Sequence, residues 1–402
     1  MIERPHYLNR LVAFKDTNLI KILTGVRRCG KSTLLKLYRQ WLESAGVASD
    51  AVVGIDLDLL EFEGLREHHA LHDHIGKRLG GNARTYVFID EVQRCPHFED
   101  AVESIFASGV ADIYLTGSNA RLFSSGLATL LSGRYVEIPI LPLSFKEYLS
   151  AQASGREGHL SREQAFARYV RYGSLPEITN LPSDEQVVSQ YLEGVFSSIL
   201  VNDIVERHEV RDVAALKRIA RFLYGNIGSF TSAASVSNAL TSAGHRLSQP
   251  TAESYLGHLS DSLLFYAVER FDVRGKEHLR HLPKYYSVDT GLRNHALGFR
   301  PGDRGHVLEN IVYLELCRRG YRVSVGKLNG LEIDFVAQRP QETLYVQVSE
   351  SVVDPRVLER ELTPLRRADG FHGRLLLTQD HDPQASYEGI AHHNILDWLL
   401  AD

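Results

Sequence analysis

"TGVRRCGKSTLL", residues 24–35, places two glycines five positions apart and follows the second directly with a lysine and a serine. In such a loop, glycines let backbone N–H groups close around a triphosphate, the lysine neutralises it and the serine holds Mg²⁺. An apolar run precedes the loop and leucines at helical spacing follow it, which predicts a strand, a loop and a helix whose N-terminus faces the anion. We expect ATP to be bound by Gly25, Val26, Arg27, Arg28, Cys29, Gly30, Lys31, Ser32 and Thr33.

A second stretch, "YVFIDEVQ" at residues 86–93, is an apolar strand that ends in two adjacent acids. Continuous Val, Ile and Phe are typical of a parallel strand buried on both faces, and ligands bind at the carboxyl end of such strands. We expect Asp90 to bind Mg²⁺ and Glu91 to orient and deprotonate the attacking water. The alternative, a solvated acidic turn, leaves the upstream phosphate loop without the acidic partner that it requires.

A third strand, "DIYLTGSNA" at residues 112–120, ends in polar residues. Asn119 is the candidate for a hydrogen bond to the attacking water or the γ-phosphate. Further on, "LLSGRYVEI" offers Arg134, whose guanidinium would stabilise charge on the transferring phosphoryl group of its own chain or of a neighbour. The alternatives are a strand cap for Asn119 and a surface arginine for Arg134.

These segments together resemble a large family of prokaryotic AAA-type ATPases. The resemblance rests on "RRCGKSTLL", "FIDEVQ", "TGSNA", "LSGRY" and "LPLSFKEYL", and on "YGSLPE" and "NDIVERHEV" in the middle of the chain. It implies an α/β fold with a parallel P-loop sheet, followed by a domain of unknown function that combines a winged helix with a restriction-endonuclease-like fold. It also implies the roles stated above for Lys31, Ser32, Asp90 and Glu91, with Asn119 as sensor and Arg134 as the family's arginine.

Size and composition set the frame for these motifs. With 402 residues, 44% hydrophobic and 24% charged, the chain is typical of a globular protein of two or three domains. We expect an ATPase domain at 1–145, a helical lid or linker at 146–210, a winged helix at 211–295 and a nuclease-like domain at 296–402. No apolar run is long enough to cross a bilayer and the first ten residues are polar, which favours a cytoplasmic protein without membrane contact.

The middle of the chain is predicted to contain the winged helix. Three helical segments, at 213–224, 232–243 and 251–264, precede an alternating stretch with a turn at Arg274-Gly275. The hairpin carries a net charge of +3 between residues 270 and 284, which would contact DNA phosphates through Arg270, Arg274, Lys276, Arg280 and Lys284. The third helix has no lysine or arginine, so binding by shape or backbone is favoured over reading of bases, and a protein partner is the alternative.

The last part of the chain has the order of a restriction-endonuclease-like metal site. Glu309 lies on a predicted helix, Asp334 on a strand, and Gln347-Val348-Ser349 on the next strand, where an acid and a lysine two residues later would complete the site. Both are missing, so we expect this site to be catalytically inactive and to serve as a docking surface.

Three functions remain open from the sequence. The leading one is a Mg²⁺-dependent ATPase that couples nucleotide hydrolysis to conformational change on DNA. The alternatives are a nucleotide-dependent signalling or defence switch that binds a protein, and an ATP-gated nuclease. A homo-oligomer is required if Arg134 acts on a neighbouring chain. The acidic and histidine residues at 67–69, "EHH", are predicted to form a solvated helix face.

Overall fold

The computed structural model describes residues 2–79, 84–119, 133–153, 160–275, 277–368, 370, 372–381 and 383–401, and for 277–281 and 301 only the backbone. The chain divides into two compact units, residues 1–142 with 261–263, and residues 143–260 with 264–402. The expected end of the ATPase domain, at residue 145, falls close to the end of the first unit. The other two expected boundaries both fall inside the second unit.

A five-stranded sheet forms the centre of the first unit, with strand order β2-β3-β4-β1-β5 and every neighbouring pair parallel. This confirms the predicted α/β class. The register sets Thr24 of β1 beside Gly117 of β4, so the carboxyl ends of β1, β3 and β4 lie along one edge. The strands are β1 (Ile20–Thr24), β2 (Val52–Asp56), β3 (Thr85–Asp90), β4 (Ala111–Gly117) and β5 (Tyr135–Pro139).

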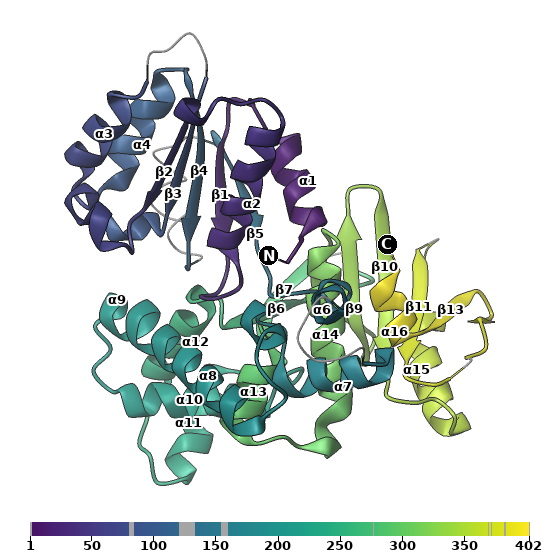
Figure 1. Cartoon of the computed structure of the whole chain (residues 1–402). Coiled ribbons are helices and arrows are strands. Elements are labelled where there is room, and N and C mark those ends of the chain that lie inside the picture. The colour runs from purple at the N-terminus through teal and green to yellow at the C-terminus, as the bar shows by residue number, and fades with distance from the viewer. Residues whose placement is uncertain are drawn as a thin grey trace. The chain divides into compact units, whose positions relative to one another are not determined.

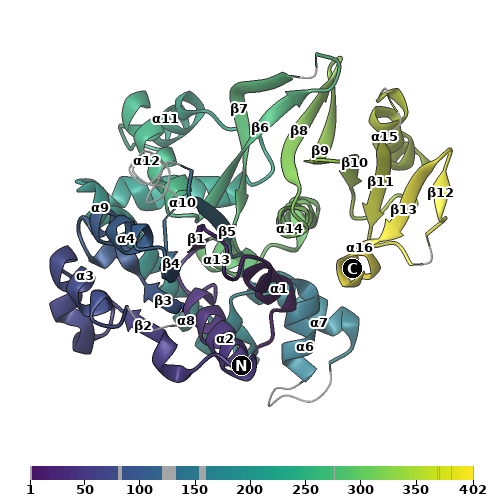
Figure 2. The ribbon, with the colours of Figure 1, turned by 90° about the horizontal axis from the view of Figure 1, so that it is seen from above.

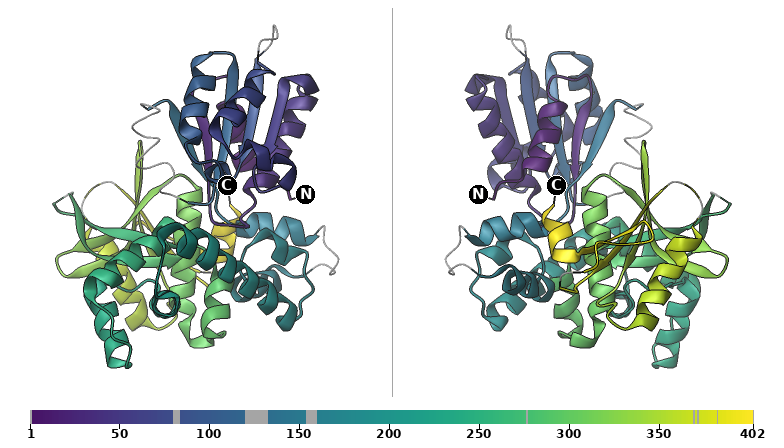
Figure 3. Two further views of the ribbon diagram at one scale, coloured as in Figure 1. Left: turned by 90° about the vertical axis from the view of Figure 1, so that its left-hand side faces the viewer. Right: turned by 90° about the vertical axis from the view of Figure 1, so that its right-hand side faces the viewer.

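Helices cover both faces of this sheet, as Figure 1 and Figure 3 show. On one face, alternate strand residues such as Ile22 and Ile89 pack with residues of α3 and α4 in one buried cluster. On the other face, Tyr38 of α2 contacts Phe88 and Tyr114. The helical segments are α1 (Pro5–Ala13), α2 (Lys31–Ser44), α3 (His68–Gly76) and α4 (Phe98–Ala107), with short 3-10 turns η1 (Ser49–Ala51), η2 (Leu60–Leu65) and η3 (Val92–Arg94).

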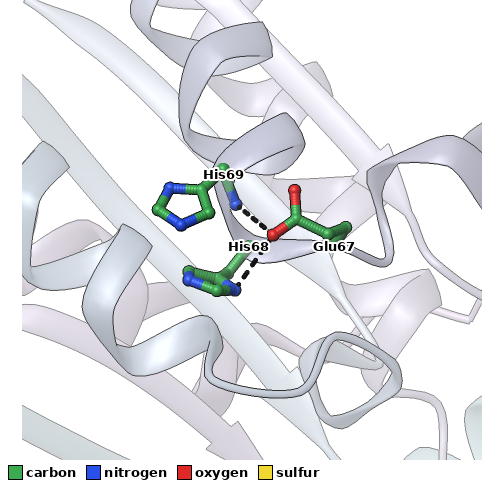
Figure 4. Close-up of side chains that lie close together, drawn as sticks. All are labelled: Glu67, His68 and His69. Atoms are coloured by element: carbon green, nitrogen blue, oxygen red, sulfur yellow. Dashed lines mark hydrogen bonds and ion pairs between the residues drawn. The ribbon is translucent and has the colours of Figure 1, made fainter.

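Glu67 caps the N-terminus of α3, whose first two residues are His68 and His69 (Figure 4). The Glu67 carboxylate accepts hydrogen bonds from the backbone N–H groups of His69 at 3.1 Å and Ala70 at 2.9 Å. These bonds hold the pKa of Glu67 below its ordinary value, because they stabilise the charged form. The carboxylate therefore satisfies donors that the first helical turn leaves unpaired.

The second unit begins with helices and ends in a mixed sheet. The three helical segments expected between 213 and 264 correspond to α10, α11 and α12. The elements are α6 (Phe145–Ala153), α7 (Arg162–Tyr172), η5 (Pro176–Thr179), α8 (Glu185–Ser198), η6 (Ile199–Val205), α9 (Glu206–His208), α10 (Val213–Gly225), α11 (Ala233–Ser242), α12 (Gln249–Asp261), α13 (Thr290–Leu297), η7 (Pro301–Asp303), α14 (Arg304–Arg318), α15 (Pro355–Arg367) and α16 (Ile395–Leu400).

The expected hairpin is present and belongs to an eight-stranded sheet of order β12-β13-β11-β10-β9-β8-β6-β7. Strand β6 is antiparallel to β7 and also pairs in parallel with β8, where Arg270 lies beside Val325 (Figure 2). The hairpin is thus a continuation of the sheet that carries Asp334 and Gln347. The strands are β6 (Phe265–Asp272), β7 (Glu277–Ser287), β8 (Arg322–Leu328), β9 (Leu331–Arg339), β10 (Glu342–Val348), β11 (Gly373–Thr378), β12 (Ser386–Tyr387) and β13 (Ile390–Asn394).

The segment "YGSLPE", residues 172–177, ties α7 to α13. The buried carboxylate of Asp289 accepts hydrogen bonds from the N–H of Ser174 at 2.6 Å and from the N–H of Leu292 at 2.9 Å. Gly173 has φ +85°, and a Cβ there would lie 2.2 Å from Oδ1 of Asp289, so only glycine fits. Burial raises the pKa of Asp289, against the effect of these bonds.

Candidate nucleotide site

The phosphate loop runs from the end of β1 into α2, as the sequence predicts. A Cβ on Gly25 would lie 2.4 Å from the carbonyl oxygen of Ile140, so the loop passes too close to β5 for any other residue. Gly30 has φ +103° and opens α2, and Lys31 is the first residue of the helix. Backbone N–H groups at this helix end have no partner within the helix and are suited to bind phosphate oxygens.

Lys31 is buried and its ammonium group bonds to the loop itself. Its Nζ donates to the carbonyl oxygen of Gly25 at 2.9 Å and lies 3.8 Å from Oε1 of Glu91. A triphosphate offers stronger acceptors than a carbonyl, because hydrogen bonds between charged groups exceed neutral ones. The ammonium group is therefore positioned to exchange a carbonyl for a phosphate oxygen when nucleotide enters.

Arg4, which precedes α1, stabilises the phosphate loop and the segment after β5 through hydrogen bonds to their backbone. Its buried guanidinium donates to the carbonyl oxygens of Cys29 at 3.1 Å, Leu141 at 2.8 Å and Pro142 at 3.3 Å. The hydroxyl of Tyr7 also accepts the N–H of Leu141 at 3.1 Å. Arg4 lies in a polar stretch without a recognised motif, so it is not among the site residues that the sequence predicts.

The two acids of β3 are joined through a threonine of β4. The hydroxyl of Thr116 donates to Oδ1 of Asp90 and accepts the N–H of Glu91 at 2.9 Å. Glu91 has φ +50°, a left-handed conformation that is uncommon outside glycine and concentrates at functional sites. Asp90, Glu91 and Thr116 are all buried, so this pair of acids is fixed rather than solvated.

Asn119 and Arg134 lie at opposite edges of the sheet. Asn119 is fully buried and follows β4 at the carboxyl edge, next to the phosphate-loop strand. Arg134 is exposed and precedes β5, and its carbonyl oxygen accepts the N–H of Ile20 at the amino edge of β1. At about 3.3 Å per strand residue, β5 puts roughly 16 Å between this edge and the phosphate loop. Arg134 therefore does not reach the nucleotide site of its own chain.

The donor set for Mg²⁺ fits the chemistry of that ion. Ser32 and Asp90 line one cavity of about 210 Å³, together with Asp56 at the end of β2. Hydroxyl and carboxylate oxygens are the ligands that Mg²⁺ takes, and it keeps several waters, for which such a cavity has room. Asp56 is not among the site residues that the sequence predicts, but it lies directly beside Asp90 in the register of β2 and β3.

The comparisons with known proteins agree with this architecture. A family model described as an AAA domain matches residues 17–149, and a domain of unknown function matches residues 163–303. An uncharacterized protein of Haemophilus influenzae is 39% identical over 401 residues, covering 100% of this chain and 99% of the relative. This chain belongs to the AAA-type P-loop ATPase family.

Two further proteins resemble this AAA-type ATPase. An uncharacterized protein of Methanocaldococcus jannaschii is 28% identical over 353 residues, covering 83% of this chain and 76% of the relative. The solved Walker-type ATPase of Pyrococcus abyssi has a TM-score of 0.51 at 14% identity, covering 74% of this chain and 96% of the other, which supports the fold alone. Within the described parts of this ATPase, no helix is both long and apolar enough to cross a membrane.

The nuclease-like residues of this protein form a partly buried cluster around a lysine. Glu309 of α14 and Glu332 of β9 lie 3.2 and 2.6 Å from Nζ of Lys284, which comes from β7. Burial opposes the charge of Lys284, but the carboxylates of Glu309 and Glu332 outweigh it and the pKa of Lys284 is raised. An ammonium group therefore lies among the acids, and this set does not fit a divalent cation.

Gln347 and Asp334 are engaged within the same cluster. Oε1 of Gln347 accepts the N–H of Asp334 at 2.7 Å, and its Nε2 donates to Glu361 at 2.8 Å. Burial and the neighbouring carboxylate of Glu309 raise the pKa of Asp334 well above its ordinary value. The acid expected at position 347 in an active site is thus replaced by an amide that crosslinks β9, β10 and α15.

The expected DNA-contact residues differ in their exposure to solvent. Lys284 is 4% exposed and paired with acids, so it does not face a partner. Arg270 is partly buried, with its guanidinium 4.5 Å from the ring centre of Phe230. Arg274 is exposed at the hairpin turn. Lys276 lies outside the described residues, and the side chain of Arg280 is likewise not described.

Proposed function

We propose that this protein hydrolyses ATP with Mg²⁺. The observation that carries the proposal is the bridge from Thr116 to Asp90 and Glu91. It fixes both acids at the sheet edge where Lys31 and Ser32 begin α2. A buried base, a phosphate-binding ammonium and a hard oxygen donor set at one edge are the parts that phosphoryl transfer to water requires.

Each residue has a distinct role in this reaction. Lys31 binds the β- and γ-phosphate oxygens, and the N–H groups that open α2 bind the phosphates with it. Glu91 orients the attacking water and accepts one of its protons. Mg²⁺, held through Ser32 and Asp90, neutralises charge on the phosphates. Asn119, buried at the same edge, is suited to hydrogen-bond the γ-phosphate.

We propose that ATP hydrolysis changes the conformation of the second unit and thereby its affinity for DNA. The support is Arg270, Arg274 and the basic hairpin sequence, which suit phosphate contacts without base reading. The burial of Lys284 favours a second candidate, a nucleotide switch that acts on a protein partner. A nuclease is not proposed, because an ammonium group and an amide stand where the metal site needs acids.

Steady-state ATP turnover tests the proposal. Wild type, Lys31→Ala and Lys77→Ala are compared without DNA, with duplex, with single strand and with a four-way junction, at two salt concentrations. Lys77 is an exposed lysine of the first unit and serves as the control. Turnover that depends on Lys31 and Mg²⁺ supports ATP hydrolysis, and equal turnover in Lys31→Ala refutes it. Stimulation by one DNA form that fades with salt supports the DNA role, whereas indifference to every DNA favours a protein partner.

A further inference from the structure

Gln93 is the polar side chain next to the proposed catalytic base. It lies two residues after Glu91, in the 3-10 turn that follows β3. Its Nε2 donates a hydrogen bond to Oε2 of Glu91 and lies 3.4 Å from the hydroxyl of Ser118. Gln93 thus joins the base on β3 to the end of β4, directly before Asn119.

The two carboxylate oxygens of Glu91 have different partners. Oε2 accepts from Gln93, and Oε1 lies 3.8 Å from the ammonium group of Lys31. Lys31 is proposed to bind phosphate during turnover, which removes it from Glu91. The bond from Gln93 comes from the same turn as Glu91 itself, so it does not depend on the position of Lys31.

The carbonyl oxygen of the Gln93 amide, Oε1, is buried and accepts no hydrogen bond from the described residues. Solvent does not reach Oε1, and no hydrogen-bond donor of the described residues lies within bonding distance of it. A shielded carbonyl without a donor costs about 1–3 kcal/mol, so this orientation of the amide is kept at a cost in stability, which is typical of a side chain that serves catalysis.

We propose that Gln93 positions the catalytic base for ATP hydrolysis, with Nε2 fixing the carboxylate of Glu91 toward the attacking water. The inference rests on the proposed ATPase function. In the step, the water oxygen bonds to the γ-phosphorus and the bond to the β–γ bridging oxygen breaks, with its electron pair remaining on ADP. Glu91 takes one proton from the water, and Gln93 gains and loses none.

The test separates catalysis from binding. ATP turnover and equilibrium binding of a fluorescent ATP analogue with Mg²⁺ are measured on the full chain for wild type, Gln93→Ala and Gln93→Glu. Gln93→Glu keeps the size of the side chain and replaces the donor by an acceptor. Gln40→Ala, at an exposed glutamine of α2, is the matched control. We expect kcat to fall about 10- to 100-fold in both Gln93 variants. The analogue's Kd should stay within about threefold of wild type.

A double variant identifies the route of the effect. If Gln93 acts through Glu91, adding Gln93→Ala to Glu91→Gln lowers kcat no further, because coupled residues are non-additive. An unchanged or faster kcat in Gln93→Ala overturns the inference, and so does a loss of turnover that tracks weaker analogue binding. A wild type without Lys31-dependent turnover refutes the proposed function instead, so the two failures are distinguishable.

Discussion

The ammonium nitrogen of Lys284 lies 2.6 Å from a carboxylate oxygen of Glu332, in a part of the chain where the sequence shows no nuclease lysine. Lys284 belongs to β7, whereas a nuclease lysine would stand at position 349, which is a serine. Lys284 and Glu309 are buried, whereas the side chain of Glu332 is 39% exposed, so the charge of Glu309 depends most on Lys284.

Replacing Lys284 by methionine should destabilise the second unit by roughly 3–5 kcal/mol, because it leaves the buried carboxylate of Glu309 without its counterion. Urea unfolding in a Trp41→Phe background measures this, since Trp398 then reports on the second unit alone. Lys217→Met, at an exposed lysine of α10, should change stability by less than about 0.5 kcal/mol. Equal stability of the two variants would contradict the buried pair.

Asp334→Asn should become more stable relative to wild type as pH rises. Burial first, and then Glu309 and Glu361, raise the pKa of Asp334 above 3.8, while Lys284 opposes them. A raised folded pKa means that the folded chain holds the proton more tightly than the unfolded chain, so wild-type stability falls as pH rises above 3.8. The asparagine lacks this slope, and its amide oxygen still accepts the N–H of Val348.

Urea unfolding at pH 4 and pH 8, followed by Trp398 fluorescence, measures that difference. The variant should gain stability over wild type between the two pH values. A difference between the two proteins that is the same at both pH values would count against the raised pKa of Asp334.

Thr116→Val should lower kcat for ATP about tenfold or more while the Kd for nucleotide stays within about threefold. The change removes the hydroxyl that joins Asp90 to the backbone of Glu91. Thr85→Val is the matched control, because Thr85 is also a buried threonine but begins β3 at the opposite edge. A Thr116 variant with the turnover of the Thr85 variant would show that the bridge does not position the acids.

Arg4→Ala should weaken both the loop and the first unit. The carbonyl oxygens of Cys29, Leu141 and Pro142 lose the hydrogen bonds from Arg4, and a buried carbonyl left without a donor costs about 1–3 kcal/mol. Trp41 fluorescence in a Trp398→Phe background reports the loss of stability, and titration with a fluorescent ATP analogue should give a higher Kd. Arg78→Ala, at an exposed arginine of the same unit, should match wild type. Unchanged analogue binding in Arg4→Ala would contradict the inference that Arg4 supports the phosphate loop.

Arg134→Ala should leave the turnover of a single chain within about twofold of wild type, because Arg134 precedes β5 at the amino edge of the sheet, away from Lys31. Turnover is measured across protein concentration, with mass photometry reporting association. A tenfold loss in dilute monomer would contradict the placement. A loss that appears only where copies associate would instead identify Arg134 as a residue that acts on a neighbouring chain.

The nucleotide site was largely predictable because its motifs are contiguous. The loop at 24–35 and the acids after β3 each combine a local pattern with a buried strand, and strand direction then brings them to one edge. The same rule, applied to Arg134, favours the alternative in which this arginine acts on a neighbouring chain over action within its own chain. A residue that precedes a parallel strand lies at the amino edge, away from the ligand.

The missed features depend on contacts between distant segments. Arg4 acts on carbonyls more than a hundred residues away at Leu141 and Pro142, and no local pattern marks such a bond. The net charge of residues 270–284 predicts that Lys284 contributes to a basic surface, because a sum along the sequence does not show which side chains face the interior. The strand of Lys284 faces the interior at that position, where Lys284 and Tyr286, two residues apart, both contact Glu309.

The pairing of β6 with both β7 and β8 limits how this chain can be dissected. A fragment that stops at residue 295 would retain the hairpin but lose β8, so the inner edge of β6 would present unpaired N–H and C=O groups. Such edges recruit other strands and favour aggregation. A fragment that starts at residue 296 would leave β8 with the same defect. Truncations for crystallography or binding assays should therefore keep residues 264–402 together.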